Sequence, residues 1–232
     1  AICITDHFHV IQELNRRVDR VRIRVQNRFR KTINTLKPKE NNKTITPEEI
    51  VELEEASRYY YVLKKFNWLL ASTNKKILDV NVERRFNHRL NRYLNYSEIL
   101  AYMLAIDDEL EEAFYLRNDV TYFYDHCTYD TAKKQLEKII IDFRSSTVAE
   151  MSPFANTLTN WKREIINSFI IVDDKANRKM NTAIVENRNK SIKLIKHASN
   201  GYLNWERFRN RILYTLNEDT TFYYTSIRKD GK

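Results

Sequence analysis

The sequence predicts a mainly α-helical protein with one short strand at its N-terminus. Its 232 residues include only two glycines and three prolines, the residues that the many tight turns of a sheet-rich fold require. Leu, Ile, Glu, Lys and Arg, which favour long helices, are abundant instead. This length is enough for one large domain or two small ones with a proper core.

The first two predicted elements are a strand and a basic helix. Residues 1–5 are short, apolar and β-branched, and they stop at Asp6, which is typical of a buried strand. From about His7 to Leu36 the periodicity is helical. The apolar stripe of this helix consists of Val10, Leu14, Val18, Val21 and Val25, and its other faces carry Arg16, Arg17, Arg20, Arg24, Arg28 and Lys31.

A linker over residues 37–46, which contains Pro38, is expected to precede a second helix. Thr46 is a favourable N-cap, Pro47 suits the first turn, and Glu49 completes a capping box. Helices are expected at 47–70, 80–93, 97–117, 130–146, 153–170, 181–199 and 204–216, with Gly201 in a left-handed conformation between the last two and a loose tail at the end of the chain.

The positive charge is concentrated in two parts of the chain. Overall, 40 Lys and Arg stand against 31 Asp and Glu, a formal net charge of +9. Residues 1–40 hold ten basic and four acidic residues, and residues 178–211 hold nine and two, whereas residues 41–177 are mildly acidic. Such patches attract a phosphate backbone, which makes DNA the expected partner, although many basic helical proteins bind no nucleic acid.

Neither a membrane protein nor a disulfide scaffold is expected. No uncharged apolar run approaches the roughly 20 residues that cross a bilayer, and the N-terminus lacks a basic-then-apolar signal pattern. Cys3 and Cys127 match no metal-binding spacing, and two isolated thiols suggest a reducing compartment. The sequence therefore predicts a soluble intracellular protein. It begins with alanine, which fits methionine removal and a start inside a longer coding region equally well.

One predicted helix carries a single carboxylate among amines and amides. With about 100° of turn per residue, one face of residues 181–199 presents Glu186, Asn189, Lys190, Lys193, Lys196 and His197. The opposite face presents Ile184, Ser191, Ile192, Ile195 and Ala198. Such an arrangement suits a site at which one acid holds a metal ion while cations hold phosphates. The alternative is an ordinary surface helix with an i,i+4 pair between Glu186 and Lys190.

A second candidate is the D-x-x-H pattern of Asp6 and His9 at the junction of strand and helix. The same two residues also suit a plain N-cap and first turn, without any further role. His7, His88 and His126 have no acidic or cysteine partners at ligand spacing, so they are interpreted as structural.

Two further patterns each allow a structural and a functional interpretation. The acidic run Asp107, Asp108, Glu109, Glu111 and Glu112 suggests a metal site, but it lies on an amphipathic helix and is interpreted as a solvated face. The run Tyr59–Tyr61 resembles a stacking platform for bases, although aromatic residues on a buried helix more often belong to the core.

Three segments together resemble one family, the insertion-sequence transposases of the ISL-three group. Residues 4–11, ITDHFHVI, resemble its D-R-F-H-V signature. Residues 181–196, NTAIVENRNKSIKLIK, resemble its N-x-x-x-E-G-x-N-x-K-I-K-x-x-K motif, and residues 201–212, GYLNWERFRNRI, are similar to its G-Y-R-N-F-x-x-F-R-x-R-I ending. The sequence departs from these motifs at Asn187, which replaces a glycine, and at Leu203, which replaces a common arginine.

The resemblance spans about residues 1–217 and implies the C-terminal portion of an RNase H-like catalytic core interrupted by an all-helical insertion. It assigns residues 1–40 and 178–217 to the core and 41–177 to the insertion, and leaves 218–232 as a loose tail. The family uses three acids, Asp-Asp-Glu. Glu186 corresponds to the third, a catalytic residue and metal ligand, while Asp6 and His9 lie beside the site. The first two acids would precede residue 1, so the chain is expected to be inactive alone.

For the complete enzyme, the resemblance implies Mg²⁺-dependent (or Mn²⁺-dependent) cleavage and strand transfer at transposon-end DNA. It also implies a homo-oligomer in the bacterial cytoplasm, associated with the nucleoid. Phosphate contacts are expected from Arg16, Arg20, Arg24, Arg188, Lys190, Lys193, Lys196, Arg207 and Arg211. Two alternatives remain open: a non-enzymatic DNA-binding protein with a helix-turn-helix over residues 181–216, and a purely structural helical protein.

Overall fold

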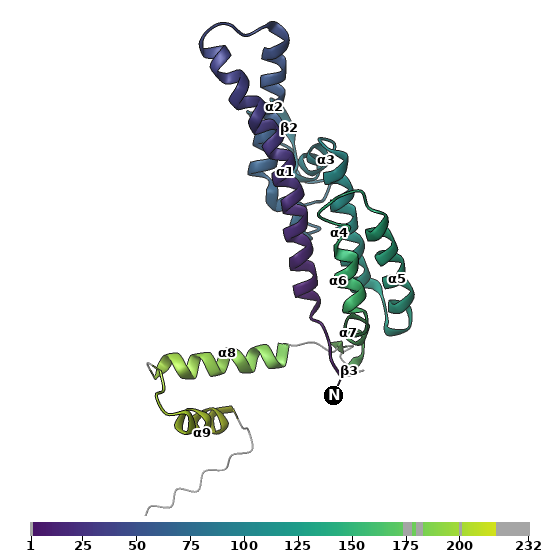
Figure 1. Cartoon of the computed structure of the whole chain (residues 1–232), viewed down its shortest axis with the longest axis vertical. Coiled ribbons are helices and arrows are strands. Elements are labelled where there is room, and N and C mark those ends of the chain that lie inside the picture. The colour runs from purple at the N-terminus through teal and green to yellow at the C-terminus, as the bar shows by residue number, and fades with distance from the viewer. Residues whose placement is uncertain (1, 174–177, 180–182, 200, 217–232) are drawn as a thin grey trace, which may run out of the picture. The chain divides into compact units, whose positions relative to one another are not determined.

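The computed structural model describes residues 2–173, 178–179, 183–199 and 201–216 (Figure 1). The chain divides into two compact units, Ala1–Met180 and Asn181–Lys232. The predicted mainly α-helical class is confirmed, because helices make up most of the described residues of both units. The strands among the described residues form two short antiparallel pairs.

The first unit is built on two long helices, α1 (His7–Asn41) and α2 (Pro47–Lys65). A short 3-10 helix, η1 (Asn67–Ala71), and the strands β1 (Arg85–Asn87) and β2 (Arg92–Leu94) follow. The remaining elements of this unit are α3 (Tyr96–Leu104), α4 (Asp108–His126), α5 (Tyr129–Ser145), α6 (Phe154–Asn160), α7 (Lys162–Asn167), β3 (Ile171–Asp173) and β4 (Arg178–Lys179). The second unit contains α8 (Ala183–Ala198) and α9 (Trp205–Leu216).

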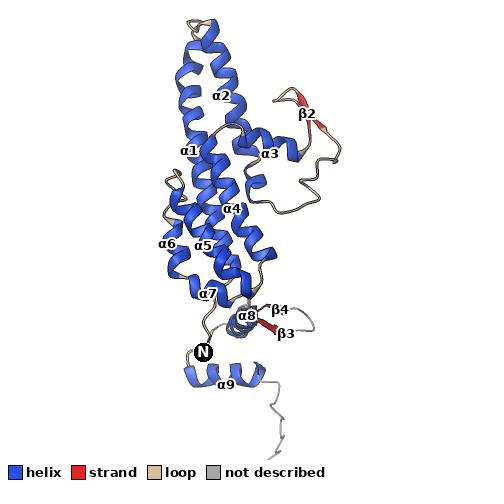
Figure 2. Ribbon diagram, turned by 90° about the vertical axis from the view of Figure 1, so that its right-hand side faces the viewer, coloured by secondary structure: helices blue, strands red, loops and turns tan. Residues whose placement is uncertain are grey.

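Helix α1 forms the axis of the first unit. Its predicted apolar stripe is confirmed, because Val10, Leu14, Val18, Val21 and Val25 are all buried. The helix packs against α2 along its C-terminal part and against α4 along its N-terminal part (Figure 2). Burying an aliphatic side chain of this size stabilises the fold by about 1.5–3 kcal/mol, so this stripe holds the unit together.

The linker expected at residues 37–46 is wrong in its first half, since α1 continues beyond Pro38 and ends at Asn41. Proline removes one backbone donor from a helix, but packing offsets the loss, because the neighbouring Leu36 is buried in this part of the unit. The predicted start of α2 is confirmed. The side chain of Thr46 accepts the Glu49 N–H at 3.3 Å, and the Glu49 carboxylate accepts the Thr46 N–H at 3.0 Å.

The helix expected at residues 80–93 is wrong, because this segment contains turns and the β1–β2 hairpin. Two asparagines explain the difference. The side chain of Asn87 accepts two backbone N–H groups at 3.1 and 3.2 Å, and Asn91 adopts a φ of 51°. Asparagine tolerates such turn conformations better than most residues, so local turn chemistry prevails here over helical periodicity.

Two other helices are shorter than expected. The segment 97–117 is divided between α3 and α4, and Asp107 begins α4 by accepting the Leu110 N–H at 3.1 Å. The segment 153–170 is divided at Trp161 into α6 and α7. The helix expected at 130–146 is confirmed as α5. The breaks let short helices turn back onto the core, which periodicity alone does not reveal.

The strand expected at residues 1–5 is wrong for the described residues 2–5, which form no strand. The Thr5 N–H donates to the Glu164 carbonyl oxygen at 3.2 Å, and the Asn167 side chain donates to the Cys3 carbonyl oxygen at 2.9 Å. A strand requires a neighbouring strand for its ladder of hydrogen bonds. The described partners of this segment belong instead to α7, so it runs as an extended coil into α1.

The second unit is a pair of helices joined by a short turn. Gly201 adopts a φ of +94°, the left-handed conformation predicted for it, and its N–H donates to the Lys196 carbonyl oxygen at 3.0 Å. Asn204 begins α9 by accepting the Arg207 N–H at 3.1 Å. The predicted tail at 218–232 lies outside the described residues.

The predicted domain boundaries stay a prediction. Helix α1, which falls in the segment 1–40 assigned to the catalytic core, shares one cluster of buried residues with helices of the segment 41–177. The segment 178–217 contributes β4 to the first unit and α8 and α9 to the second. In the parts of the chain that the structure describes, no helix combines the length and apolarity needed to span a membrane.

Candidate functional site

Asp6 lies at the N-terminus of α1 and caps this helix. Its carboxylate oxygen Oδ1 accepts the Phe8 N–H at 2.9 Å and lies 3.3 Å from Nδ1 of His7. The His9 N–H donates to the Asp6 carbonyl oxygen at 3.2 Å, and the His9 side chain is exposed. The structure therefore brings Asp6 and His9 together in the first turn of α1, and it adds His7, which sequence analysis interpreted as structural, beside the carboxylate.

A tyrosine on α4 lies next to this helix end. The Tyr124 ring centroid is 5.7 Å from that of His7. Burial raises the pKa of Tyr124 well above its usual value, and the negative charge of Asp6 adds to this effect. Lys179 on β4 donates to the carbonyl oxygens of Tyr124 and Cys127, at 2.9 and 3.3 Å, at the C-terminus of α4. Nothing in the sequence distinguishes Tyr124 from the other tyrosines, so its position was not predictable.

Acidic side chains neutralise several arginines of α1. Arg24 forms ion pairs with Glu109 and with Glu150, the latter at 2.8 Å, and Arg28 pairs with Asp107 at 2.6 Å. The hydrogen bond from Arg24 lowers the pKa of Glu150. The acidic run on α4 therefore neutralises part of α1, and Arg24, a predicted phosphate contact, is engaged inside the unit.

Replacing Arg24 by glutamine is expected to lower the free energy of unfolding at neutral pH by about 1 kcal/mol, since solvent screens partly exposed pairs. The pKa of Glu150 is lower in the folded chain than in the unfolded chain. The ion pair with Arg24 therefore stabilises the fold at pH values above the pKa that Glu150 has in the unfolded chain. That stabilisation is lost as pH falls through the folded pKa. The difference between wild type and R24Q in urea unfolding should therefore shrink in acid. An equal difference at neutral and acid pH would contradict the role of this pair.

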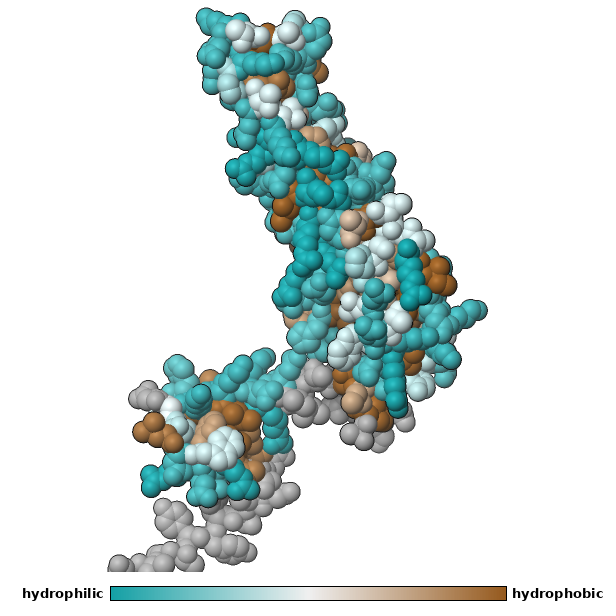
Figure 3. Space-filling view, in the orientation of Figure 1, coloured by the Kyte–Doolittle hydropathy of each residue, from teal (hydrophilic) through white to brown (hydrophobic). Residues whose placement is uncertain are grey.

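The other predicted arginines of α1 lie at the surface. Arg16 is 61% exposed and 3.7 Å from Glu13, and Arg20 is also exposed. Arg20 borders a shallow hollow of about 650 Å³ whose lining residues are Arg20, Ile23, Arg24, Asn27, Arg28, Arg30, Lys31 and Asn34. Figure 3 shows a mostly hydrophilic surface along this unit.

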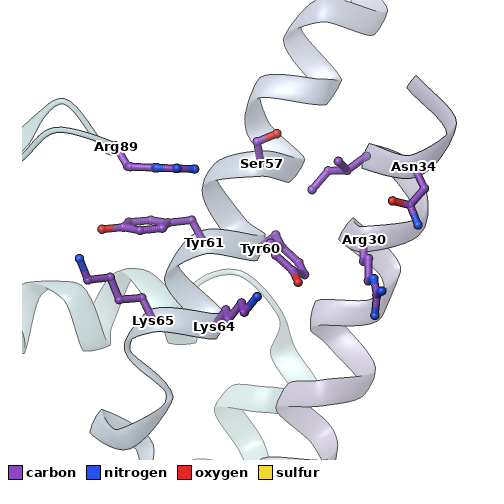
Figure 4. A pocket seen from close by; sticks show the side chains of 9 residues that line it. Arg30, Asn34, Ser57, Tyr60, Tyr61, Lys64, Lys65 and Arg89 are labelled. Carbon is purple, nitrogen blue, oxygen red and sulfur yellow. The ribbon is translucent and has the colours of Figure 1, made fainter. Parts of the chain in front are cut away.

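A second hollow of about 640 Å³ lies between α1 and α2 (Figure 4). We call it the basic groove, and its lining residues are Arg30, Ile33, Asn34, Ser57, Tyr60, Tyr61, Lys64, Lys65 and Arg89. Four of these are cations, two are tyrosines and none is acidic. The sequence pattern singled out the tyrosines but not the cations. The signal for the two lysines was their i,i+4 spacing from Tyr60 and Tyr61 on one helix.

The tyrosine run belongs only in part to the core. Tyr61 packs against the core, while Tyr60 and Tyr61 both line the basic groove. The hydroxyl of Tyr59 donates to the Glu55 carboxylate at 2.6 Å, outside this groove. Core packing therefore accounts for only part of the run.

In the second unit, α8 shows the predicted polar face, and the predicted opposite face only in part. Glu186 lies in its first turn and is exposed. Asn189, Lys190, Lys193, Lys196 and His197 are exposed as well, whereas Ser191, Ile192 and Ile195 are half-buried. Ile184 belongs to the residues whose side chains the structure does not describe, and Ala198 is exposed. The carboxylate thus lies on the lysine-bearing face.

The remaining predicted cations of this unit differ in their contacts. Arg188 donates to the Leu216 carbonyl oxygen, Arg211 lies over the Tyr214 ring at 5.9 Å, and Arg207 is exposed. No residue of α9 is buried. Apolar side chains consequently lie at the surface of the unit, and they include Leu194, Leu203, Trp205 and Leu213. Figure 3 shows brown patches on this unit.

The described residues do not form a complete metal site. Among them, no group of three or more His, Cys, Asp or Glu could hold a metal ion. Mg²⁺ requires several hard oxygen ligands in near-octahedral geometry, so Glu186 as a single carboxylate does not fit a two-metal centre by itself. Asp6 and His9 belong to the first unit and Glu186 to the second.

Comparison with known proteins identifies a family over most of the chain. A family described as transposase, of the DDE type and the ISL-three group, matches residues 1–212. This range includes the segment 4–11 that resembles the D-R-F-H-V signature, the helix with Glu186 and the closing motif that begins at Gly201. Neither a curated protein nor a solved structure matches the chain.

Proposed function

Since this chain belongs to the ISL-three family of DDE transposases, we propose that it takes part in DNA cleavage and strand transfer, with Glu186 as the third acid of an Asp-Asp-Glu triad. The observation that supports this most is the continuous family match, which includes both late motifs. Transposases of this family use divalent metal ions. Mg²⁺ or Mn²⁺ is the expected ion, and Glu186 is the residue of this chain expected to ligate it.

The proposal gives Asp6 and His9 a place beside the catalytic site. Asp6 holds the first turn of α1 through its cap and thereby positions His9 and the neighbouring His7. The proposal requires that this helix end and the first turn of α8 come together in the active enzyme, as an RNase H-like core would arrange them.

DNA is the proposed partner, and its phosphates are the proposed ligands of the basic faces. In the first unit, Arg16 and Arg20 are exposed and suited to this role, whereas the ion pairs of Arg24 make it a weaker candidate. In the second unit, the proposed contacts are Arg188, Lys190, Lys193, Lys196, Arg207 and Arg211. Phosphate contacts give affinity without sequence choice, so recognition of transposon ends is proposed to need other sequence. We also propose that the complete enzyme is a homo-oligomer in the cytoplasm and that it is associated with the nucleoid.

The 232-residue chain is expected not to cleave DNA by itself, because a two-metal centre requires more carboxylates than Glu186. The test is a nicking assay with Mg²⁺ or Mn²⁺ on DNA that carries the element's ends. The expected result is no cleavage above a metal-only control. Cleavage by the chain that E186A abolishes would contradict this expectation, because the chain would then itself hold all the carboxylates that the reaction needs.

A second candidate function is a non-enzymatic DNA-binding protein. The observation in its favour is that α8, the turn at Gly201 and α9 form a helix-turn-helix-like pair with exposed cations. Gel shifts separate the two functions. The transposase proposal expects weak binding of the isolated chain without sequence preference, whereas a regulator would retain specific binding to a site with two spaced halves.

A further inference from the structure

We propose that the basic groove binds one unpaired nucleotide of a DNA strand, with the base stacked on Tyr60 and the flanking phosphates held by Lys64, Lys65 and Arg89. This inference rests on the proposed function, which makes DNA the partner of the chain. It adds two features that the family match does not assign: the position of a binding site, and the unpaired state of the DNA that binds there.

The charge of the groove favours an anionic ligand. Arg24, on the same helix as Arg30, is neutralised by Glu109 and Glu150. In the described part of the chain, none of the four groove cations forms such an ion pair, and none of the lining residues is acidic. Uncompensated cations that converge on one hollow attract phosphate by counterion release.

Aromatic rings hold three of these cations in place. Lys64 Nζ lies 5.5 Å from the Tyr60 ring centroid. Lys65 Nζ and the Arg89 guanidinium carbon lie 5.4 and 5.3 Å from the centroid of Tyr61, and Figure 4 shows them on opposite sides of this ring. A guanidinium that stacks on a ring keeps its N–H edge directed outward for phosphate. The rings therefore reduce the entropy that phosphate binding would otherwise cost.

The size of the groove and the position of Tyr60 favour an unpaired nucleotide over a duplex. Figure 4 shows Tyr60 between α2 and α1, across from Arg30 and Asn34. The volume of about 640 Å³ falls within the roughly 300–1,000 Å³ of sites that bind small molecules. In a duplex, neighbouring base pairs cover the faces of each base, whereas an unpaired base offers a face to an aromatic ring.

The groove is continuous with the basic face of α1. Arg30 and Asn34 line both the groove and the hollow that begins at Arg20. From Arg20 to Asn34 the helix rises about 21 Å, the length of several phosphates along a strand. A duplex that follows this face would bring its unpaired end to the groove.

The test compares two fluorescent DNAs of equal duplex length, one blunt and one with a short single-stranded overhang that contains 2-aminopurine. Wild type is expected to bind the overhang DNA about 10-fold more tightly, a typical effect of stacking one base on an aromatic ring, and to quench 2-aminopurine. Y60L is expected to lose both the preference and the quenching, with unchanged affinity for blunt DNA.

Two double variants with equal charge change provide the matched control. K64Q/K65Q is expected to weaken overhang binding and to flatten the slope of log affinity against log salt by about 1.4, the value for two lost single-strand phosphate contacts. K75Q/K76Q removes two exposed lysines that do not line the groove and is expected to change neither measurement. Because Lys64 and Lys65 are exposed, this pair keeps the test valid if Y60L unfolds.

The possible failures are distinguishable. Absence of any DNA binding by wild type at low salt would overturn both the proposal that DNA is the partner and the proposal that the groove binds a nucleotide. Equal binding of both DNAs, or equal effects of the two lysine pairs, would overturn the groove alone and leave the proposed transposase function in place.

Discussion

Replacing Arg117 by alanine is expected to lower the free energy of unfolding by about 3–4 kcal/mol, the largest loss of stability predicted here for one residue. Arg117 on α4 is only 2% exposed. Its guanidinium donates to the Asn15 side chain on α1 at 2.9 Å, to the Asn118 side chain at 2.9 Å and to the Ala71 carbonyl oxygen at the end of η1 at 2.8 Å. One buried cation thus joins three elements.

The predicted loss has two physical causes. Truncation removes the donor from the acceptor oxygens of Asn15 and Ala71, whose hydrogen bonds with Arg117 are partly buried, and a buried acceptor left without a partner costs about 1–3 kcal/mol. It also leaves a cavity where the long side chain was. Burial lowers the pKa of Arg117, because desolvation disfavours the charged guanidinium.

Urea unfolding of R117A and of R163A as a matched control measures this effect. Arg163 is exposed on α7, and its truncation should change stability by less than about 0.5 kcal/mol. For a unit of this size, the loss in R117A corresponds to a decrease in Tm of roughly 10 °C. If R117A and R163A unfold at the same urea concentration, Arg117 does not hold α1, η1 and α4 together.

Local sequence signals predicted much of the fold. The spacing of apolar residues gave the buried stripe of α1, and the capping box of Thr46 and Glu49 gave the start of α2. Gly201 marked the turn between α8 and α9. Each of these features depends on residues that follow one another closely in the sequence, so the sequence contains the whole signal.

Features that depend on distant residues could not be predicted. The extension of α1 beyond Pro38 depends on packing with α2, and the buried position of Arg117 depends on acceptors from two other elements. The basic groove likewise combines α1, α2 and Arg89 next to the hairpin. The roles of Asp6 and Glu186 came from the motifs that resemble the family, and they remain proposals about residues in two separate units.

Replacing Glu186 by glutamine is expected to reduce transposition in cells by roughly three orders of magnitude. Glutamine preserves the size of the side chain but removes the negative charge, and loss of a carboxylate ligand at a catalytic metal removes several kcal/mol of transition-state stabilisation. Glu186 is exposed in the first turn of α8 on the face that also bears Lys190, Lys193 and Lys196. Little loss of stability is therefore expected from the same substitution.

A matched control separates a catalytic role from a general effect of charge. Glu206 is the corresponding exposed glutamate in the first turn of α9, and E206Q makes the same chemical change. The most direct measurement is the transposition frequency of the element whose transposase gene carries E186Q or E206Q, at equal protein levels. The account predicts near-complete loss with E186Q and a frequency within a few-fold of wild type with E206Q. Transposition that continues at the wild-type frequency in E186Q would contradict the assignment of Glu186 as the third acid.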